Sequence, residues 1–169
     1  NSHQAVNNAL NKISQHNIPT FKISNEFKTV SLNDDVKKFS AMWEYTNYLK
    51  GRNPQRRRNQ RNAGDVIGMT LCGAIMNLAL HGNSFTPSIV LIDEASQIPL
   101  CFGAAIGGLA GGTYVFIGDD RQMPPIYHEK MVADSMSISI FEHLQKILPK
   151  ELKTTLTTTY RMNSTICRY

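Results

Sequence analysis

The stretch Ile89–Gln97, which reads IVLIDEASQ, runs from four apolar residues directly into two adjacent carboxylates, Asp93 and Glu94. A short apolar run of this length predicts a buried strand, and such strands alternating with helices predict a parallel sheet covered on both faces. In sheets of this kind, ligands bind just outside the carboxyl ends of the strands. The sequence therefore predicts an α/β fold with both carboxylates at a ligand-binding edge.

A second apolar stretch, 113–117, is followed by a comparable polar segment, GDDRQMPP at 118–125. One carboxylate of the Asp93–Glu94 pair can hold a hydrated Mg²⁺ while the other orients or deprotonates a water, and phosphoryl transfer needs both functions together. The amide of Gln122 can sense a phosphate or a metal-bound water. The alternative for a bare Asp-Glu pair is that it only favours the N-terminus of a following helix.

Apolar periodicity and turn residues predict the other elements. Helices are expected over 4–13, 34–50, 71–80 and 137–148, strands over 65–70, 88–92 and 113–117, and a mixed helix and glycine-rich loop over 95–110. Weaker strand patterns occupy 19–30 and 153–159. The apolar residues of the first helix are expected to form one face: Val6, Ala9, Leu10 and Ile13. Those of the helix over 137–148 are expected to form another: Ile140, Phe141, Leu144, Ile147 and Leu148.

The aromatic residues of the second predicted helix are expected to form its packing face: Trp43, Tyr45 and Tyr48. Aromatic side chains can also stack on the bases of single-stranded nucleic acid, which is the alternative for these three.

The 169-residue chain has a net charge of +5, and one segment supplies all of it. Six basic residues and no acidic ones lie between Lys50 and Arg61, and the other 12 basic residues are balanced by 13 acidic ones. The segment reads KGRNPQRRRNQR and is punctuated by glycine and proline, so we expect a loop or mobile insert that meets a local anionic partner.

The cysteines and the hydropathy indicate the compartment. Cys72, Cys101 and Cys167 lie far apart and form no CxxC pair, so reduced thiols are expected. No apolar run approaches the ~20 residues that a membrane helix needs, so we expect no membrane partner. We expect an intracellular protein, cytoplasmic or nuclear, and not a secreted one.

Four motifs in order resemble those of the superfamily 1 helicases: SHQAV at 2–6, DEASQ at 93–97, GDDRQMPP at 118–125 and TYRMN at 159–163. The similarity is greatest to the branch of the nonsense-mediated-decay helicase and its replication and immunoglobulin-switch-region relatives, whose patterns are DEA-S/A-Q, GDxxQLPP and QYRM. It spans nearly the whole chain but is thin over 18–64.

The resemblance implies a partial RecA-like P-loop NTPase fold, a parallel sheet flanked by helices. The first motor domain would occupy 1–152 with a short basic insert at about 31–64, and the second would begin at 153–169. The implied cofactors are ATP and Mg²⁺, and the implied partner is single-stranded DNA or RNA.

The resemblance also implies roles for the residues near the two strand ends. Asp93 would hold the Mg²⁺ through its water shell, and Glu94 would activate the hydrolytic water. Gln97 would support that site, Asp119 would position its loop, and Gln122 would contact the γ-phosphate or its water.

Further roles fall near the ends of the chain. Tyr160 would stack on the adenine, and Arg161 would bring positive charge to the γ-phosphate. Ser2, His3 and Thr70 match positions that touch the nucleic-acid backbone. The sequence departs from the family at His3, where Asn is usual, at Met123, where Leu is usual, and at Thr159, where Gln is usual.

The arginines of the basic segment are a separate hypothesis. Arg56, Arg57, Arg58 and Arg61 are predicted to contact backbone phosphates without reading sequence. The alternative is a solvated loop whose charge aids solubility.

No GxxxxGK[ST] loop, which cradles phosphates in this family, occurs in the sequence. We therefore expect a piece of a longer protein that, taken alone, neither binds ATP tightly nor unwinds a duplex. The function expected of the whole is an ATP-driven helicase or translocase. The alternatives are a nucleic-acid-stimulated ATPase that does not unwind, and a degenerate helicase kept as a nucleic-acid-binding or interaction module.

Overall fold

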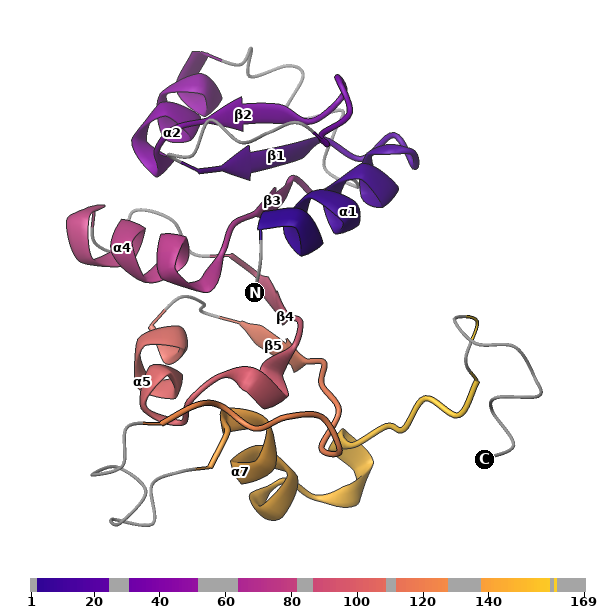
Figure 1. Ribbon diagram of the computed structural model, residues 1–169. Helices are drawn as coiled ribbons and strands as arrows, with labels where there is room; N and C mark the ends of the chain where they lie inside the picture. Colours follow the sequence, from indigo (N-terminus) through magenta and orange to yellow (C-terminus); the bar gives the residue numbers. More distant parts are fainter. Residues whose placement is uncertain are drawn as a thin grey trace.

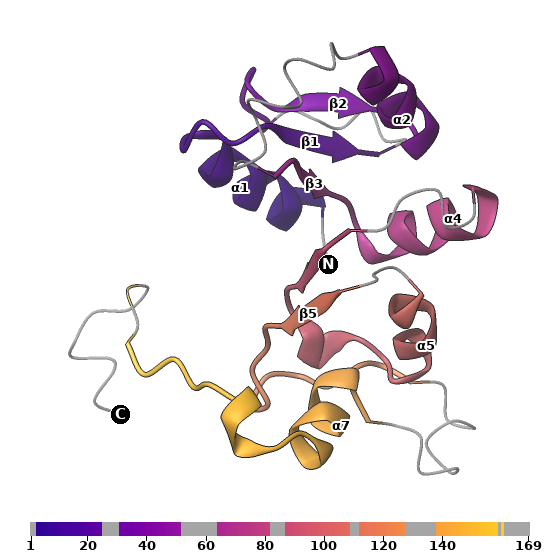
Figure 2. The same ribbon diagram turned by 180° about the vertical axis from the view of Figure 1, so that it is seen from behind.

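The computed structural model describes residues 3–24, 31–51, 64–81, 87–108, 112–127, 138–158 and 160. These residues form two small parallel sheets with flanking helices, one with strand order β2-β1-β3 and the other with β4 beside β5 (Figure 1). The view from behind shows the same arrangement, with the three-stranded sheet above the two-stranded one (Figure 2). The expected α/β class with parallel strands is confirmed.

The first sheet combines strands β1 (Thr20–Ile23), β2 (Lys37–Phe39) and β3 (Val66–Gly68). Both neighbours of β1 run parallel to it, and Phe21 pairs with Lys37 on one side and Ile67 on the other. Its helices are α1 (His3–Ser14), α2 (Met42–Gly51) and α4 (Leu71–His81).

The expected helix over 34–50 is wrong in its first part, because Lys37–Phe39 is strand β2 and α2 begins only at Met42. The backbone of Lys37–Phe39 pairs with β1, and the Phe39 ring stacks on Phe21 with centroids 6.1 Å apart. Tertiary pairing thus overrides an aromatic-rich pattern that reads locally as helix.

Tyr45 and Tyr48 pack as expected. Both rings lie against Phe21, at centroid distances of 5.1 and 5.8 Å. The Tyr45 hydroxyl donates a hydrogen bond to Asp65 at 2.8 Å, and the ammonium of Lys37 donates to the Tyr48 hydroxyl at 2.9 Å. The prediction is wrong for Trp43, whose side chain is 53% exposed.

Ser40 and Glu44 fix the start of α2. The Glu44 carboxylate accepts hydrogen bonds from the Ser40 hydroxyl at 2.6 Å and from the Ser40 amide at 2.8 Å. The hydroxyl bond and then the amide bond hold the pKa of Glu44 below its usual value, because both favour the charged carboxylate. Ser40 donates both bonds, so the Glu44 side chain satisfies a backbone donor that lies before the helix and has no intrahelical partner.

Helix α1 forms over the expected residues, but its buried face is partly polar. Of the expected apolar face, Leu10 is buried and Val6 and Ile13 are half-buried, whereas Ala9 is exposed. The polar residues Asn7 and Ser14 are buried as well, so the buried face is mixed.

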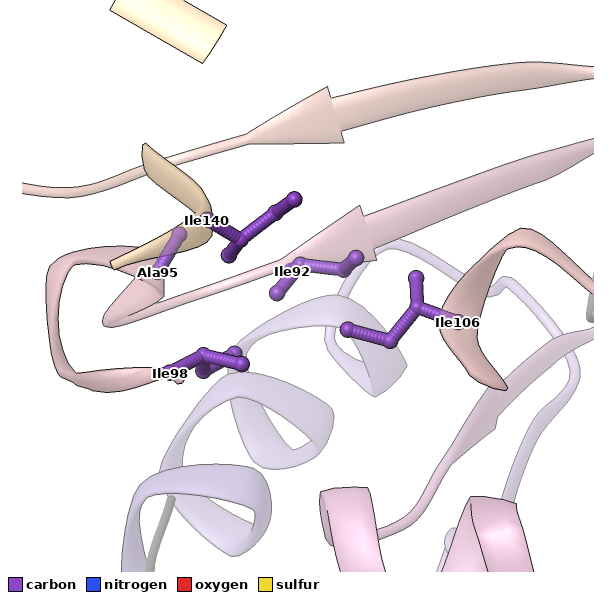
Figure 3. Close-up of a cluster of buried hydrophobic side chains, with 5 residues drawn as sticks. All are labelled: Ile92, Ala95, Ile98, Ile106 and Ile140. Atoms are coloured by element: carbon purple, nitrogen blue, oxygen red, sulfur yellow. The ribbon is translucent and has the colours of Figure 1, made fainter. Parts of the chain in front are cut away.

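The second sheet consists of β4 (Ile89–Ile92) and β5 (Thr113–Phe116), with Ile89 opposite Thr113 and Ile92 opposite Phe116. Around it lie the short helices η1 (Ala95–Gln97) and η2 (Lys150–Leu152) and the α-helices α5 (Cys101–Gly107) and α7 (Ile140–Ile147). Figure 3 shows the buried cluster that joins them: Ile92, Ala95, Ile98, Ile106 and Ile140.

The amphipathic pattern predicted helix α7 well. It begins after Ser139, whose hydroxyl accepts a hydrogen bond from the Glu142 amide at 3.0 Å. Phe141 and Leu144 pack against the buried cluster, as expected. Ile147 was expected on the same face but is largely exposed in the last turn.

Only one face of the second sheet is covered in the described part of the chain. Val90, Tyr114 and Phe116 pack on the buried cluster. Side chains alternate between the two faces of a strand, and the opposite face presents four exposed apolar residues: Ile89, Leu91, Val115 and Ile117. The expected cover on both faces is therefore not found here.

The strand expected at 153–159 is also absent, because residues 153–158 have no regular structure and are exposed. No extended partner contacts them in a ladder within the described chain. No helix among the described residues has the length and hydropathy needed to cross a membrane.

The close approach of Gly112 to the neighbouring strand gives a test of the β4–β5 arrangement. A Cβ at Gly112 would overlap the carbonyl oxygen of Ser88, which accepts the hydrogen bond of Thr113 at 2.9 Å. Gly112→Ala should lower the free energy of unfolding by about 1–3 kcal/mol because the backbone must shift.

Gly107→Ala in α5 is the matched control, because nothing lies within 4 Å of a Cβ there. It should leave stability unchanged or raise it by up to about 1 kcal/mol. Urea denaturation measures both variants, and equal effects would contradict the packing described for Gly112.

Candidate functional site at the carboxyl ends of β4 and β5

Two backbone hydrogen bonds bring the DEASQ and GDDRQMPP segments together. The Ile117 amide donates to the Ile92 carbonyl at 2.8 Å, and the Ile117 carbonyl accepts from the Ala95 amide at 2.8 Å. The ladder between β4 and β5 thus continues past both strands. Asp93 and Glu94 leave one strand beside the point where Gly118 and Asp119 leave the other.

The first loop holds its carboxylates in defined positions. The exposed Asp93 carboxylate accepts a hydrogen bond from the Glu94 amide at 3.0 Å. Glu94 is half-buried and has left-handed backbone angles, φ 54° and ψ 40°. Its carboxylate accepts a long hydrogen bond from the Gln97 amide side chain at 3.4 Å. Gln97 therefore lies where it can orient Glu94.

The second loop is a turn organised by Asp119. One oxygen of its carboxylate accepts from the Arg121 amide at 3.0 Å, and the other accepts from the Gln122 side chain at 3.3 Å. The backbone amide of Gln122 donates a hydrogen bond to the Asp119 carbonyl at 3.3 Å, which closes the turn. Asp119 and Gln122 are both exposed, so their remaining lone pairs and protons face solvent.

Gly118 permits the close packing beneath the two loops. A Cβ there would lie 3.0 Å from the Ser96 amide nitrogen and 3.1 Å from the Phe141 ring. Helix α7 thus supports the loops through Phe141. The buried Ser96 hydroxyl has no hydrogen-bond partner in the described part of the chain. Sequence reasoning did not single out Ser96, and it placed Phe141 on the apolar face of a helix without linking it to the site.

The donor set of the two loops suits a hard cation better than a soft one. The side chains of the two loops offer carboxylate and amide oxygens. Among the described residues, His, Cys, Asp and Glu nowhere form a group of three or more that could hold a metal ion. Mg²⁺ fits such a site, since it keeps several waters and takes one or two carboxylates together with substrate phosphates.

The other predicted site residues lie elsewhere. His3 begins α1, with its Nδ1 3.5 Å from the Ser24 hydroxyl, and the Thr70 hydroxyl accepts a hydrogen bond from the Gly73 amide at 3.2 Å near the start of α4. Tyr160 is 96% exposed and packs against none of the described elements. Six predicted residues lie outside the described residues: Ser2, Arg56, Arg57, Arg58, Arg61 and Arg161.

The structure therefore brings together five of the predicted residues at one sheet edge: Asp93, Glu94, Gln97, Asp119 and Gln122. It does not bring Tyr160 to them, because the described chain after η2 runs away from the sheets (Figures 1 and 2).

Comparison of the chain with models of known protein families finds no match. Comparison with curated proteins finds no similar one.

The left-handed backbone at Glu94 predicts an unusual stability order. A residue with a Cβ pays roughly 1–2 kcal/mol for this conformation, whereas glycine adopts it freely. Glu94→Gly should therefore be more stable to unfolding than Glu94→Ala by about 1 kcal/mol.

The matched pair at Gln97, inside η1, should show the opposite order, with alanine more stable than glycine. Thermal unfolding of the four variants measures both orders. A Glu94→Gly variant less stable than Glu94→Ala would contradict the strain inferred here.

Proposed function

We propose that this chain is part of an ATP-driven motor that acts on single-stranded nucleic acid, of the superfamily 1 helicase type. It would comprise most of the first motor domain, residues 1–152, and the start of the second, residues 153–169. The observation that supports this best is the joining of the two motif loops through the backbone N–H and C=O of Ile117. Four residues that the resemblance assigns to ATP hydrolysis, Asp93, Glu94, Asp119 and Gln122, follow two directly paired parallel strands.

Bound ATP would supply the phosphoryl group, and the accompanying Mg²⁺ would neutralise much of the negative charge of the phosphates. Asp93 is the residue proposed to hold the hydrated ion, because its carboxylate is exposed at the strand end. Glu94 is proposed to accept a proton from the attacking water, and the Gln97 side chain orients it. Asp119 positions Gln122, whose amide then meets the γ-phosphate or the water.

Motor action also needs a link between nucleotide state and movement. Gln122 is the proposed link, because it belongs to a turn that the continued ladder at Ile117 joins to β4. Nucleic acid would bind at the edge of the first sheet near His3 and Thr70. The arginine-rich segment would add nonspecific phosphate contacts.

The hydrolysis test uses the full-length protein that contains this chain. We expect ATP turnover that rises with single-stranded DNA or RNA and falls by at least about 100-fold in Glu94→Gln, because a positioned base contributes about that much. Glu151→Gln is the charge-matched control, since Glu151 is exposed in η2 and has no proposed role in hydrolysis.

Equal turnover in the wild type and Glu94→Gln would refute the role of Glu94. No turnover with either nucleic acid would favour a degenerate module that only binds. Turnover without strand displacement on a duplex with a single-stranded tail would instead identify an ATPase that does not unwind. The isolated 169-residue chain should show no turnover, because its sequence has no GxxxxGK[ST] loop.

Charge reversal of the arginines tests the phosphate contacts. Changing Arg56, Arg57, Arg58 and Arg61 to glutamate should weaken binding to single strands and reduce the slope of log K against log salt by about 3, since each phosphate contact contributes roughly 0.7. Fluorescence anisotropy over a salt series measures the slope. An unchanged affinity and slope would leave the segment as a solvated loop.

A further inference from the structure

A buried lysine lies between α1 and the first sheet. Lys22, in the centre of β1, is 1% exposed, and its ammonium donates a hydrogen bond of 2.5 Å to the side-chain carbonyl of Asn7. Asn7 is itself only 2% exposed. Burying an ammonium group costs several kcal/mol unless it is well bonded, so a lysine here is a poor means of gaining stability alone.

Hydrogen bonds continue from Asn7 to the segment that contains Ser31 and Asn33. The Asn7 amide donates to the Ser31 hydroxyl at 3.0 Å, and that hydroxyl donates to the Gln4 side chain at 3.2 Å. One turn further along the helix, the Asn11 side chain accepts from the Asn33 amide at 2.9 Å. Lys22 is thus a buried member of a polar network along one face of α1.

The spacing of the polar contacts defines how α1 lies on β1. Asn7 meets Lys22, and four residues earlier His3 approaches Ser24, which follows Lys22 by two. Four residues of helix rise about 6 Å and two residues of strand about 6.6 Å, so the two contacts are in register. Helix and strand run in opposite directions (Figure 1), which places the start of α1 at the carboxyl end of β1.

The parallel pairing of β1 with β3 brings a second predicted contact to this edge. Lys22 pairs with Gly68, so the continuation of the register places Ser24 level with Thr70. His3, next to Ser24, and Thr70 therefore both lie at the carboxyl edge of the first sheet. Separate motifs predicted these two residues as nucleic-acid contacts, and the position of α1 decides whether they can act together.

We propose that Lys22 is a positioning residue for nucleic-acid binding, which acts through Asn7 to fix α1 along β1 and so to hold His3 beside Thr70. A directional hydrogen bond permits one register, whereas an apolar contact permits neighbouring ones. The inference rests on the proposed function, because it concerns the strand-binding edge of the same motor.

The test replaces the polar pair by an apolar one in the full-length protein. Lys22→Met with Asn7→Leu removes both buried polar groups while keeping the length of the first side chain and the branching of the second, so the melting temperature should change little. Affinity for fluorescein-labelled oligo(dT) and oligo(U), measured by anisotropy, should nevertheless fall about tenfold. Leu10→Val is the packing control: it should lower the melting temperature but leave affinity unchanged, because Leu10 is buried on α1 outside the network.

A double-mutant cycle separates positioning from simple support of the fold. His3→Ala should weaken binding in the wild type but have no further effect in the Lys22→Met/Asn7→Leu background. Asn7→Asp should keep the wild-type affinity and the full effect of His3→Ala, because a carboxylate still accepts from Lys22, and this variant decides the matter if the apolar pair fails to fold.

The outcomes are distinct. If the wild type binds and the effects of His3→Ala and Lys22→Met/Asn7→Leu on affinity simply add, the inference is overturned and the proposed function stands. A large loss of affinity in Asn7→Asp would have the same meaning. No binding of either oligonucleotide by the wild type overturns both.

Discussion

The backbone of Ile117 is the constraint on which the candidate site depends. Its N–H and C=O bond to Ile92 and Ala95, on either side of the Asp93–Glu94 pair. Every other hydrogen bond described at the site is local, within one loop or the other. The continued ladder carries the pairing of β4 and β5 past both strand ends, so a backbone interaction fixes the proximity that the side-chain chemistry requires.

Much of this edge could be predicted because its signals are local. Unbroken apolar runs marked β4 and β5, and polar residues directly after each run marked the carboxyl edge of a parallel sheet. The 3.6-residue period marked α7, although the expected start at 137 lies before the observed one at Ile140. In each case the residues that carry the signal also make the interaction, so no distant partner had to be known.

The failures depend on distant partners or on backbone angles. Strand β2 exists because Phe39 meets Phe21, which is far along the chain, and the polar face of α1 exists because Asn7 meets Lys22 fifteen residues away. Glutamate gives no hint of a positive φ, so the strained backbone at Glu94 was equally hidden. Non-local contacts and strain at a site are thus the parts that a local reading of this sequence omits.

The exposed side of the β4–β5 sheet has a consequence for the chain in solution. Leu91 is 64% exposed there, beside three other aliphatic residues that water must hydrate. Excluded salts such as sulfate strengthen the burial of apolar surface, whereas cooling weakens it. In the described part of the chain, the side-chain alternation that builds the core also leaves this exposed apolar face. We therefore expect ammonium sulfate to precipitate the chain, and cold buffers with little sulfate to keep it in solution.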